Sequence, residues 1–326
     1  MKLVFLGTAE FAVPSLEAVV RAGHDVALVV TQPDRPRGRS GRPEPPPVKV
    51  AAGRPGLPVA QPEEKLKESP VARRMLEIAP DAAVVVAYGK WIPNVLLGVP
   101  RLGFLNVHGS LLPKYRGAAP VQWAVASGET ETGVTIIRLT DRLDAGPVLA
   151  RRAVAIGERE TAAGVLARLG PVGADLLVET LAALEAGRAR EEAQDEAAAT
   201  YAPVLAKEDG LVDWGRPARE IAWRVRGFTP WPGAHGRLER AKGPLRVELV
   251  EAREASAPLP RPAAPGEVLG AAEDGLLVAA GEGTGLVVLR LKPEGKREMA
   301  ADEFLRGRGV APGDRFAPPA PQAAAS

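Results

Sequence analysis

The stretch KLVFLGTAEFAVPSLEAVVRAGHDVALVVT, residues 2–31, decides the fold class. Its first apolar run, Lys2–Leu6, ends at Gly7 and is followed by a helical pattern at Glu10–Ala22. A second apolar run covers Val26–Thr31. A strand, a helix and a strand within about thirty residues are typical of a βαβ unit, which builds parallel sheets. The stretch therefore predicts an α/β fold.

The rest of the first half of the chain repeats this pattern. Because apolar runs between helices are typical of strands buried on both faces, we expect an open, doubly wound, mostly parallel sheet. Further strands are expected at Ala82–Ala87, Phe104–Val107 and Val134–Leu139, and helices at Ser69–Ala79, Pro120–Ser127 and Thr161–Ala186.

The pattern changes beyond Ala186. Residues 187–206 are rich in Ala and Glu with weak periodicity, which is typical of a linker or a frayed helix. Short apolar alternations between Gly and Pro turns then predict a small β-barrel or sandwich, with strands at Leu245–Val250, Gly266–Leu269, Gly275–Ala279 and Gly285–Leu291. We therefore expect a first domain at 1–188, a linker at 189–206, a β domain at 207–316 and a disordered tail at 317–326.

Composition excludes several classes of protein. The 326 residues contain no cysteine, so disulfides, thiolate metal sites and a cysteine nucleophile are excluded. Three histidines lie far apart in sequence, which argues against a histidine metal centre, and we expect no metal. No apolar run is long enough to cross a membrane, and Met1–Gly7 predicts a first strand rather than a signal peptide. We expect a cytoplasmic protein with no membrane partner, and nothing in the sequence requires more than a monomer.

The turn after the first strand argues against a dinucleotide site. It reads Gly7-Thr8-Ala9-Glu10, with a single glycine and an acidic residue where a pyrophosphate would lie. The G-x-G-x-x-G pattern and a phosphate-binding P-loop are both absent. A nicotinamide-dependent dehydrogenase is therefore disfavoured, and the fold alone does not decide the function.

The segment NVHGSLLPKYRGAAP, residues 106–120, carries side chains suited to catalysis. Asn106 and His108 are two residues apart at the end of a predicted strand, so both lie on one face. Ligands of open α/β sheets bind at the carboxyl ends of strands. An asparagine donor beside a histidine is suited to stabilising an oxyanion and moving a proton. The alternative is a polar strand end whose Asn and His bind loop carbonyls.

A carboxylate partner is expected at Asp144. It lies in DRLDAGP, residues 141–147, directly after the predicted strand Val134–Leu139. An Asp followed by Ala-Gly-Pro is also a common turn sequence, so a purely structural role remains the alternative.

Several motifs in order along the chain resemble one enzyme family. They are TQPDRP at 31–36, VVAYG at 85–89, NVHGSLLPKYRGAAPVQW at 106–123, ETGVTI at 131–136, LDAGP at 143–147, KED at 207–209, DW at 213–214 and PWP at 230–232. Together they resemble the 10-formyltetrahydrofolate-dependent formyltransferases, and in particular the branch that formylates methionyl initiator tRNA. The resemblance spans residues 2 to about 316 and implies a Rossmann-like catalytic domain followed by an OB-like barrel.

The resemblance also implies roles for individual residues. The catalytic residues would be Asn106, His108 and Asp144. The residues that bind 10-formyltetrahydrofolate would be Ser110, Leu111, Leu112 and Pro113, with the backbone of Val86, Ala87 and Tyr88 facing the pterin. The reaction implied is formyl transfer to the α-amino group of methionyl initiator tRNA, giving the tRNA that initiates bacterial translation, without a metal.

Local charge supports a tRNA partner that the net charge of +2 conceals. Residues 31–54 carry six basic and two acidic side chains, or +4, and residues 214–246 carry eight and two, or +6. The composition of the first segment is typical of a flexible, solvated insertion. The alternative is a flexible arm that becomes ordered when its arginines contact tRNA. The second segment predicts phosphate contacts, with a solvated helix face as the alternative. The resemblance implies tRNA contacts by Arg35, Arg37, Arg39, Arg42 and Lys207.

Three alternatives remain open at this stage. Sugar-nucleotide N-formyltransferases share the N-x-H pattern and a later Asp, and they can carry extra domains. Glycinamide ribonucleotide formyltransferase is a single compact domain, so the C-terminal extension argues against it. A catalytically silent RNA-binding protein on the same scaffold is disfavoured by the presence of Asn106, His108 and Asp144.

Overall fold

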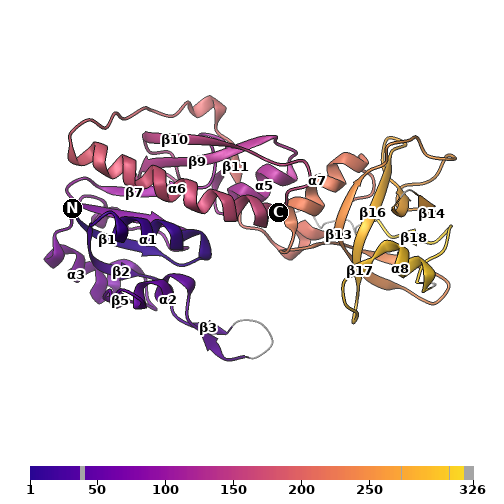
Figure 1. Ribbon diagram of the computed structural model, residues 1–326, viewed down its shortest axis with the longest axis horizontal. Coiled ribbons are helices and arrows are strands. Elements are labelled where there is room, and N and C mark those ends of the chain that lie inside the picture. The colour runs from indigo at the N-terminus through magenta and orange to yellow at the C-terminus, as the bar shows by residue number, and fades with distance from the viewer. Residues whose placement is uncertain (37–40, 273, 308, 319–326) are drawn as a thin grey trace. The chain divides into compact units, whose positions relative to one another are not determined.

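A mostly parallel sheet with helices beside it is followed by a smaller β domain (Figure 1), so the expected fold class is confirmed. The computed structural model describes residues 1–36, 41–272, 274–307 and 309–318. The chain divides into two units. Unit 1 comprises Met1–Pro120, Glu131–Ala155 and Gly164–Pro203, and unit 2 comprises Val121–Thr130, Ile156–Ala163 and Val204–Ser326.

Unit 1 is built around one sheet. Among the described residues its strands follow the order β10-β9-β7-β6-β1-β2-β5. The strands are β1 Lys2–Gly7, β2 Asp25–Val30, β5 Val59–Ala60, β6 Ala82–Val86, β7 Phe104–His108, β9 Glu131–Arg138 and β10 Val148–Ala155. The helices are η1 Glu10–Ala12, α1 Val13–Arg21, α2 Pro47–Gly53, η2 Leu66–Glu68, α3 Pro70–Ile78, α4 Asn94–Leu97, η3 Glu196–Ala198 and α6 Ala162–Glu185, whose first two residues belong to unit 2. Short pairs are β3 Arg35–Pro36 with β4 Pro43–Glu44, and β8 Arg116–Gly117 with β11 Tyr201–Ala202.

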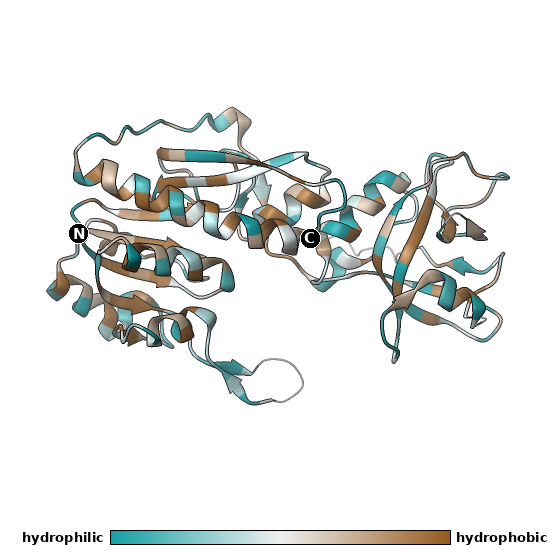
Figure 2. Ribbon diagram, in the orientation of Figure 1, coloured by the Kyte–Doolittle hydropathy of each residue, from teal (hydrophilic) through white to brown (hydrophobic). Residues whose placement is uncertain are grey.

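The opening βαβ unit forms as the sequence predicts. Strand β1 is buried from Leu3 to Gly7 and pairs in parallel with β2 and β6. Helix α1 begins with Pro14 in its first turn and buries Leu16 and Val19, because apolar residues recur at helical spacing. Figure 2 shows the hydrophobic residues along β1, and the core of this half of the sheet joins β1, β2, β6 and α3.

The sheet changes direction at β9. Strand β7 pairs in parallel with β6, whereas β9 runs antiparallel to β7, and β10 runs antiparallel to β9. Strand β10 was not predicted from the sequence, because its residues alternate between partly buried and exposed rather than forming an apolar run. An antiparallel edge on a parallel sheet accommodates such a half-solvated strand.

Residues 187–203 do not form the frayed helix that was one of the two expectations. After α6 the fully described segment runs extended, with the single turn η3 and the short strand β11. Its backbone forms hydrogen bonds with the rest of unit 1 at two places. Glu192 pairs with Val148, and β11 pairs with β8. The segment is therefore an ordered part of unit 1.

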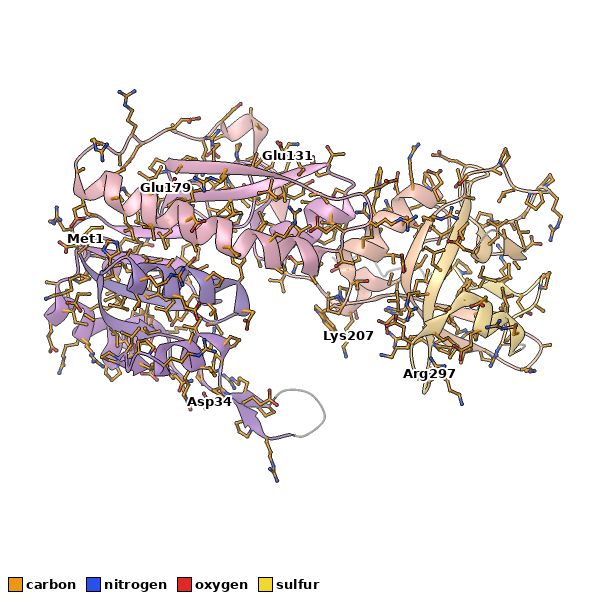
Figure 3. All side chains as sticks on the ribbon, in the orientation of Figure 1. Met1, Asp34, Glu131, Glu179, Lys207 and Arg297 are labelled. Carbon is orange, nitrogen blue, oxygen red and sulfur yellow. The ribbon has the colours of Figure 1, made fainter. Side chains whose placement is uncertain are left out.

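The basic segment 31–54 is only partly an extended arm. Helix α2 buries Val48, Ala51 and Ala52, so the expectation of a flexible arm is wrong for residues 47–53. Strands β3 and β4 form a short antiparallel ladder. Asp34 (Figure 3) lies at its root, where its carboxylate accepts bonds of 2.8 and 2.7 Å from Lys49 Nζ and Gln61 Nε2. The hydrogen bond from Gln61 and, to a smaller extent, that from Lys49 lower the pKa of Asp34.

Unit 2 is a closed β-barrel with helices packed on it. Its strands are β12 Ala234–Glu239, β13 Leu245–Glu254, β14 Val268–Ala272, β15 Gly275–Ala279, β16 Gly285–Pro293, β17 Met299–Ala300 and β18 Arg315–Phe316. Its helices are α5 Pro120–Ala126, η4 Lys207–Gly210, α7 Ala218–Phe228 and α8 Ala301–Arg306. The first residue of α5, Pro120, belongs to unit 1. The described strands follow the order β14-β15-β16-β13-β12-β18, and Arg315 bridges back to Glu267 beside β14. The sheet thus closes on itself.

The barrel core consists of inward-facing apolar residues together with α7 and α8. Trp214 stacks on Phe316 with ring centroids 4.7 Å apart, and both are buried. In the same unit Trp123 of α5 meets Phe228 of α7 edge to face at 5.4 Å. The close approach of these helices requires Gly227, because a Cβ there would lie 2.6 Å from Ala126. The predicted tail lies largely outside the described residues, since 319–326 are not among them.

Candidate active site

The carboxylate of Asp144 connects the two polar residues at the end of β7. Asn106 Nδ2 donates a hydrogen bond of 3.2 Å to Asp144 Oδ1. His108 Nδ1 lies 3.7 Å from Asp144 Oδ2. Asp144 and His108 are buried, and Asn106 is half-buried. The structure therefore brings together Asn106, His108 and Asp144.

The histidine ring is oriented from its other nitrogen. His108 Nε2 lies 2.9 Å from the carbonyl oxygen of Tyr115, which can only accept a hydrogen bond. Nε2 therefore carries a proton and donates it to Tyr115. Nδ1 is left facing Asp144 Oδ2.

Asp144 reaches this place by a route that differs from the one expected. Because β9 is antiparallel to β7, its carboxyl end lies beside the beginning of β7, with Arg138 opposite Leu105. The loop 139–147 then returns over the sheet, and Asp144 adopts a left-handed backbone with φ 46°. The backbone N–H of Gly117 donates 2.9 Å to Asp144 Oδ2. The residue is thus placed by its loop and by Gly117, rather than by the end of a parallel strand.

The side chains of the loop after His108 mostly serve the loop itself. Ser110 is buried and its Oγ donates 2.6 Å to the carbonyl of Lys114. Leu111 packs on Gly133 of β9, where an added Cβ would lie 2.5 Å from Leu111 Cδ2. Leu112 is buried with Ile137 and Val148. Ser110 and Leu112 are therefore buried, whereas Leu111 and Pro113 are half-buried.

The end of β6 places one exposed residue between two buried ones. Val86 and Tyr88 are buried, and the Tyr88 side chain lies in the core, where desolvation raises its pKa to about 12. Thr8 Oγ1 and Gln32 Nε2 both donate to the Tyr88 carbonyl. Between these two buried residues, Ala87 is exposed and left-handed, with φ 43°.

The residues expected to bind tRNA lie in both units. Arg35 and Arg42 are exposed on the β3–β4 hairpin, whereas Arg37 and Arg39 lie outside the described residues. Lys207 (Figure 3) is exposed at the start of η4, a turn held by a 2.7 Å bond from the Ala206 N–H to Asp209 Oδ2.

Part of the basic cluster at 214–246 is used within unit 2. Arg224 donates to the carbonyl of Asp209 and lies 4.9 Å over the Phe228 ring. Arg226 donates to the carbonyls of Gly157 and Glu160. Burial lowers the pKa of both guanidinium groups. These bonds agree with a structural role for both arginines within unit 2, and the phosphate contacts expected of the wider segment 214–246 stay a prediction.

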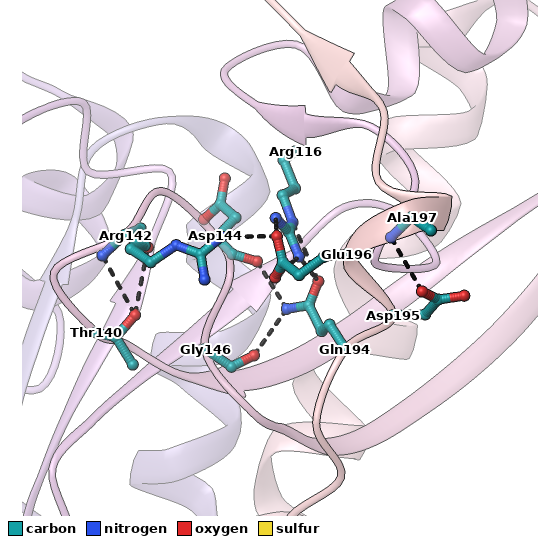
Figure 4. A network of polar contacts seen from close by, with 9 residues as sticks. All are labelled: Arg116, Thr140, Arg142, Asp144, Gly146, Gln194, Asp195, Glu196 and Ala197. Atoms are coloured by element: carbon teal, nitrogen blue, oxygen red, sulfur yellow. Dashed lines mark hydrogen bonds and ion pairs between the residues drawn. The ribbon is translucent and has the colours of Figure 1, made fainter.

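A polar network beside Asp144 was not predicted from the sequence (Figure 4). Arg116 is 1% exposed and pairs with Glu196 at 3.0 Å. Gln194 bonds Arg116 and the Asp144 loop, and Arg142 pairs with Glu196 at 2.6 Å. The hydrogen bonds from Arg116 first and Arg142 next lower the pKa of Glu196 to about 2. The signal in the sequence was the run of polar residues within Ala-rich 189–200, which resembles a solvated linker.

The described part of the chain contains neither a candidate membrane span nor a candidate metal-binding cluster. None of its helices is long and apolar enough to cross a membrane. No group of three or more His, Asp or Glu side chains in that part is arranged to hold a metal ion.

Both units match models of one family. Residues 1–181 match the formyl transferase model, and residues 204–309 match the formyl transferase C-terminal domain. The chain is 52% identical over 317 residues to a methionyl-tRNA formyltransferase of Acidobacterium capsulatum, covering 97% of this chain and 99% of the relative. It is 47% identical over 320 residues to that of Heliobacterium modesticaldum, covering 97% and 100%.

Solved structures share the fold at lower identity. A sugar 3N-formyl transferase, WlaRD, crystallised with dTDP and 5-N-formyl-THF, has a TM-score of 0.65 at 14% identity and covers 91% of this chain and 99% of that chain. HypX from Aquifex aeolicus in complex with tetrahydrofolic acid has a TM-score of 0.59 at 18% identity, covering 94% and 47%. These likenesses support the fold.

Proposed function

The chain belongs to the formyl transferase family, and from that premise we propose that Asn106, His108 and Asp144 are its catalytic residues. The enzyme transfers a formyl group from 10-formyltetrahydrofolate to the α-amino group of methionyl initiator tRNA. The product, N-formylmethionyl-tRNA, serves translation initiation. The observation that supports the catalytic assignment is the contact of one carboxylate, that of Asp144, with both Asn106 and His108.

The attacking group is the methionyl α-amine. Because a free α-amine has a pKa near 8, an appreciable neutral fraction is present at neutral pH without a strong base. Its lone pair attacks the formyl carbon, and the carbonyl electrons move to oxygen to give a tetrahedral intermediate. When the C–N10 bond breaks, the folate nitrogen takes a proton and the amine has lost one, so the exchange balances.

Asn106 and His108 are suited to the oxyanion and Asp144 to the proton. One N–H of Asn106 is held by Asp144, which directs the amide and leaves its second N–H for the oxyanion. Protonated His108 would add a cation beside the same charge, balanced by Asp144 at 3.7 Å. Asp144 is then placed to accept a proton from the attacking nitrogen, directly or through one water.

The residues present fit the folate co-substrate. We propose that the pterin binds along the exposed backbone at Ala87, between Val86 and Tyr88. The loop from Ser110 to Pro113 would contribute backbone groups and the Pro113 ring. This arrangement positions the formyl donor, while the chemistry remains with Asn106, His108 and Asp144.

We propose that Arg35, Arg37, Arg39, Arg42 and Lys207 contact tRNA. Exposed guanidinium and ammonium groups bind phosphates and release counterions, so affinity should fall with salt. We also propose that residues 1–188 form the catalytic domain and 207–316 the tRNA-binding domain. Residues 189–206 join them, and of these 189–203 belong to unit 1. We further propose that the protein is a monomer and that it acts in the cytoplasm, where aminoacylated tRNA is made. Sedimentation of the full chain tests its oligomeric state.

A substrate panel tests the function. The full chain is incubated with labelled 10-formyltetrahydrofolate and with charged initiator tRNA, charged elongator tRNA or an amino-sugar nucleotide. We expect rapid transfer to the initiator tRNA and little to the other two acceptors. Transfer to the sugar nucleotide alone would overturn the tRNA assignment, and tRNA binding without transfer to any acceptor would indicate a silent binding protein.

A further inference from the structure

One segment of unit 1 contacts both the loop that follows His108 and the loop that carries Asp144. We call residues 192–202 the strap. It begins where Glu192 and Val148 exchange backbone hydrogen bonds of 2.8 and 2.9 Å, and it ends at β11, which pairs with β8. The loop at 109–118 lies on one part of the strap and the loop at 139–147 on another.

The strap fixes the carbonyl that orients His108. The Tyr115 N–H donates 2.9 Å to Thr200 Oγ1, and the Arg116 N–H donates 2.8 Å to the Thr200 carbonyl. Tyr115 has a left-handed backbone with φ 61°, which is uncommon for a side chain of that size. Its carbonyl is the acceptor for His108 Nε2. Bonds from the strap thus stabilise the peptide that orients the histidine.

The strap also holds the backbone of Asp144 through one side chain (Figure 4). Gln194 Nε2 donates 2.7 Å to the carbonyl of Asp144 and 2.7 Å to the carbonyl of Gly146. Both N–H groups of the amide are therefore used on the loop. Asp144 itself lies at φ 46°, a conformation that persists where surrounding contacts impose it.

The orientation of the Gln194 amide is fixed by the buried guanidinium of Arg116. Gln194 Oε1 accepts 3.2 Å from Arg116 Nε and 2.9 Å from Nη2. Because a guanidinium has only donors, the oxygen must face Arg116 and the NH₂ group must face the two carbonyls. Glu196, paired with Arg116 and Arg142, balances the charge of the guanidinium.

We propose that Gln194 is a positioning residue for formyl transfer, which holds the Asp144 carboxylate against Asn106 and His108. The proposal rests on the catalytic role proposed above for Asp144. Gln194 reaches the carboxylate only through the Asp144 main chain, so it changes the position of Asp144 and not its charge. A misplacement of about 1 Å in a catalytic group can lower a rate about 10²-fold.

Two variants of similar volume test the proposal. Gln194→Met removes all four hydrogen bonds of the amide. Gln194→Glu keeps the contact with Arg116 but places a carboxylate oxygen against the carbonyls of Asp144 and Gly146. We expect each to lower kcat about 10- to 100-fold, with KM for both substrates within twofold of the parent. The matched control is Glu192→Gln, which removes an exposed ion pair with Arg151 on the same strap and should leave kcat unchanged.

A double-mutant cycle with Asp144→Ala separates positioning from general loosening. If Gln194 acts through Asp144, Gln194→Glu should change kcat less than twofold in the Asp144→Ala background. An equal loss in both backgrounds would overturn the proposal, as would a Gln194→Glu enzyme with parental kcat. Should Gln194→Met fail to fold, Gln194→Glu, which retains the Arg116 pairing, still gives the answer. An inactive parent would instead contradict the proposed function, so the two failures are distinguishable.

Discussion

Asn106 Nδ2 donates a hydrogen bond of 3.2 Å to Oδ1 of Asp144, from the strand β7 to the loop that follows β9. The second oxygen of the same carboxylate accepts from the Gly117 N–H and faces His108. Each oxygen therefore has a separate task, one on the amide and one on the imidazole. A change that converts one oxygen into a donor should therefore disrupt the hydrogen bond that this oxygen accepts.

Asp144→Asn is predicted to abolish most of the activity without loss of fold. The amide keeps the volume of the carboxylate, but its NH₂ group must face either Asn106 Nδ2 or the Gly117 N–H, which are both donors. The base is lost as well. We expect a single-turnover rate about 10²- to 10⁴-fold lower, measured with saturating folate and charged tRNA.

The control for this substitution lies three residues away. Asp141 is exposed in the same loop, and Asp141→Asn should retain the parental rate. tRNA affinity, measured by filter binding, should be equal in all three proteins. An Asp144→Asn enzyme with turnover within fivefold of the parent would remove Asp144 from the mechanism.

Gly117→Ala is predicted to destabilise the protein more than an ordinary glycine substitution. Gly117 has φ 122°, and a Cβ there would lie 2.5 Å from the backbone oxygen of Ala202. The strain should cost about 1–3 kcal/mol and move the N–H that binds Asp144. Gly23→Ala, at φ 78° with nothing within 4 Å, is the control and should cost about 1 kcal/mol. Thermal unfolding compares the two, and equal losses would show that the contact with Ala202 has no effect.

The ion pairs of Glu196 predict a pH-dependent stability. The folded-state pKa of Glu196, about 2, is below its ordinary value of 4.5. The stabilisation is therefore fully present above pH 4.5 and is lost as the pH falls toward 2. We expect Glu196→Gln to lower Tm at pH 7, with a difference from the parent that narrows below pH 4.5. A difference that stayed constant from pH 7 to pH 3 would contradict the assigned pairing with Arg116.

Binding of tRNA is predicted to weaken steeply with salt. If the exposed basic residues contact phosphates, the dissociation constant should rise by at least tenfold between about 50 and 200 mM salt. Lys207→Ala should reduce the slope of log affinity against log salt by about one. Lys67→Ala, which removes an exposed lysine outside both basic segments, should leave the slope unchanged. Affinity insensitive to salt would contradict the phosphate contacts.

Much of the fold follows from apolar runs, and the exceptions have physical causes. The strands β1, β2, β6 and β7 are buried on both faces, so their apolar runs identify them. Strand β10 alternates like a solvated edge and carries no such run. Helix α2 is short, and prolines and charged side chains interrupt the apolar residues around it, so it carries no apolar run that would predict a helix. Local hydrophobic patterns therefore predict which strands are buried, but they do not predict which edge of a sheet is antiparallel.

The candidate site was predictable where motif and strand coincide. Asn106 and His108 stand on one strand, so a period of two places them together. Asp144 was predicted from its motif, but its path depends on the direction of β9, which is a property of the whole sheet. Gln194 contacts the site only through hydrogen bonds across some 50 residues of sequence, and a lone glutamine in a polar stretch carries no periodic signal.

The most direct test of the account is the single-turnover rate of formyl transfer to methionyl initiator tRNA by His108→Ala, beside the parent enzyme. His108 is the residue whose ring lies between the Tyr115 carbonyl and Asp144. The account predicts a rate at least about 10²-fold below that of the parent, with unchanged tRNA affinity. A His108→Ala enzyme that transfers the formyl group at nearly the parental rate would contradict it.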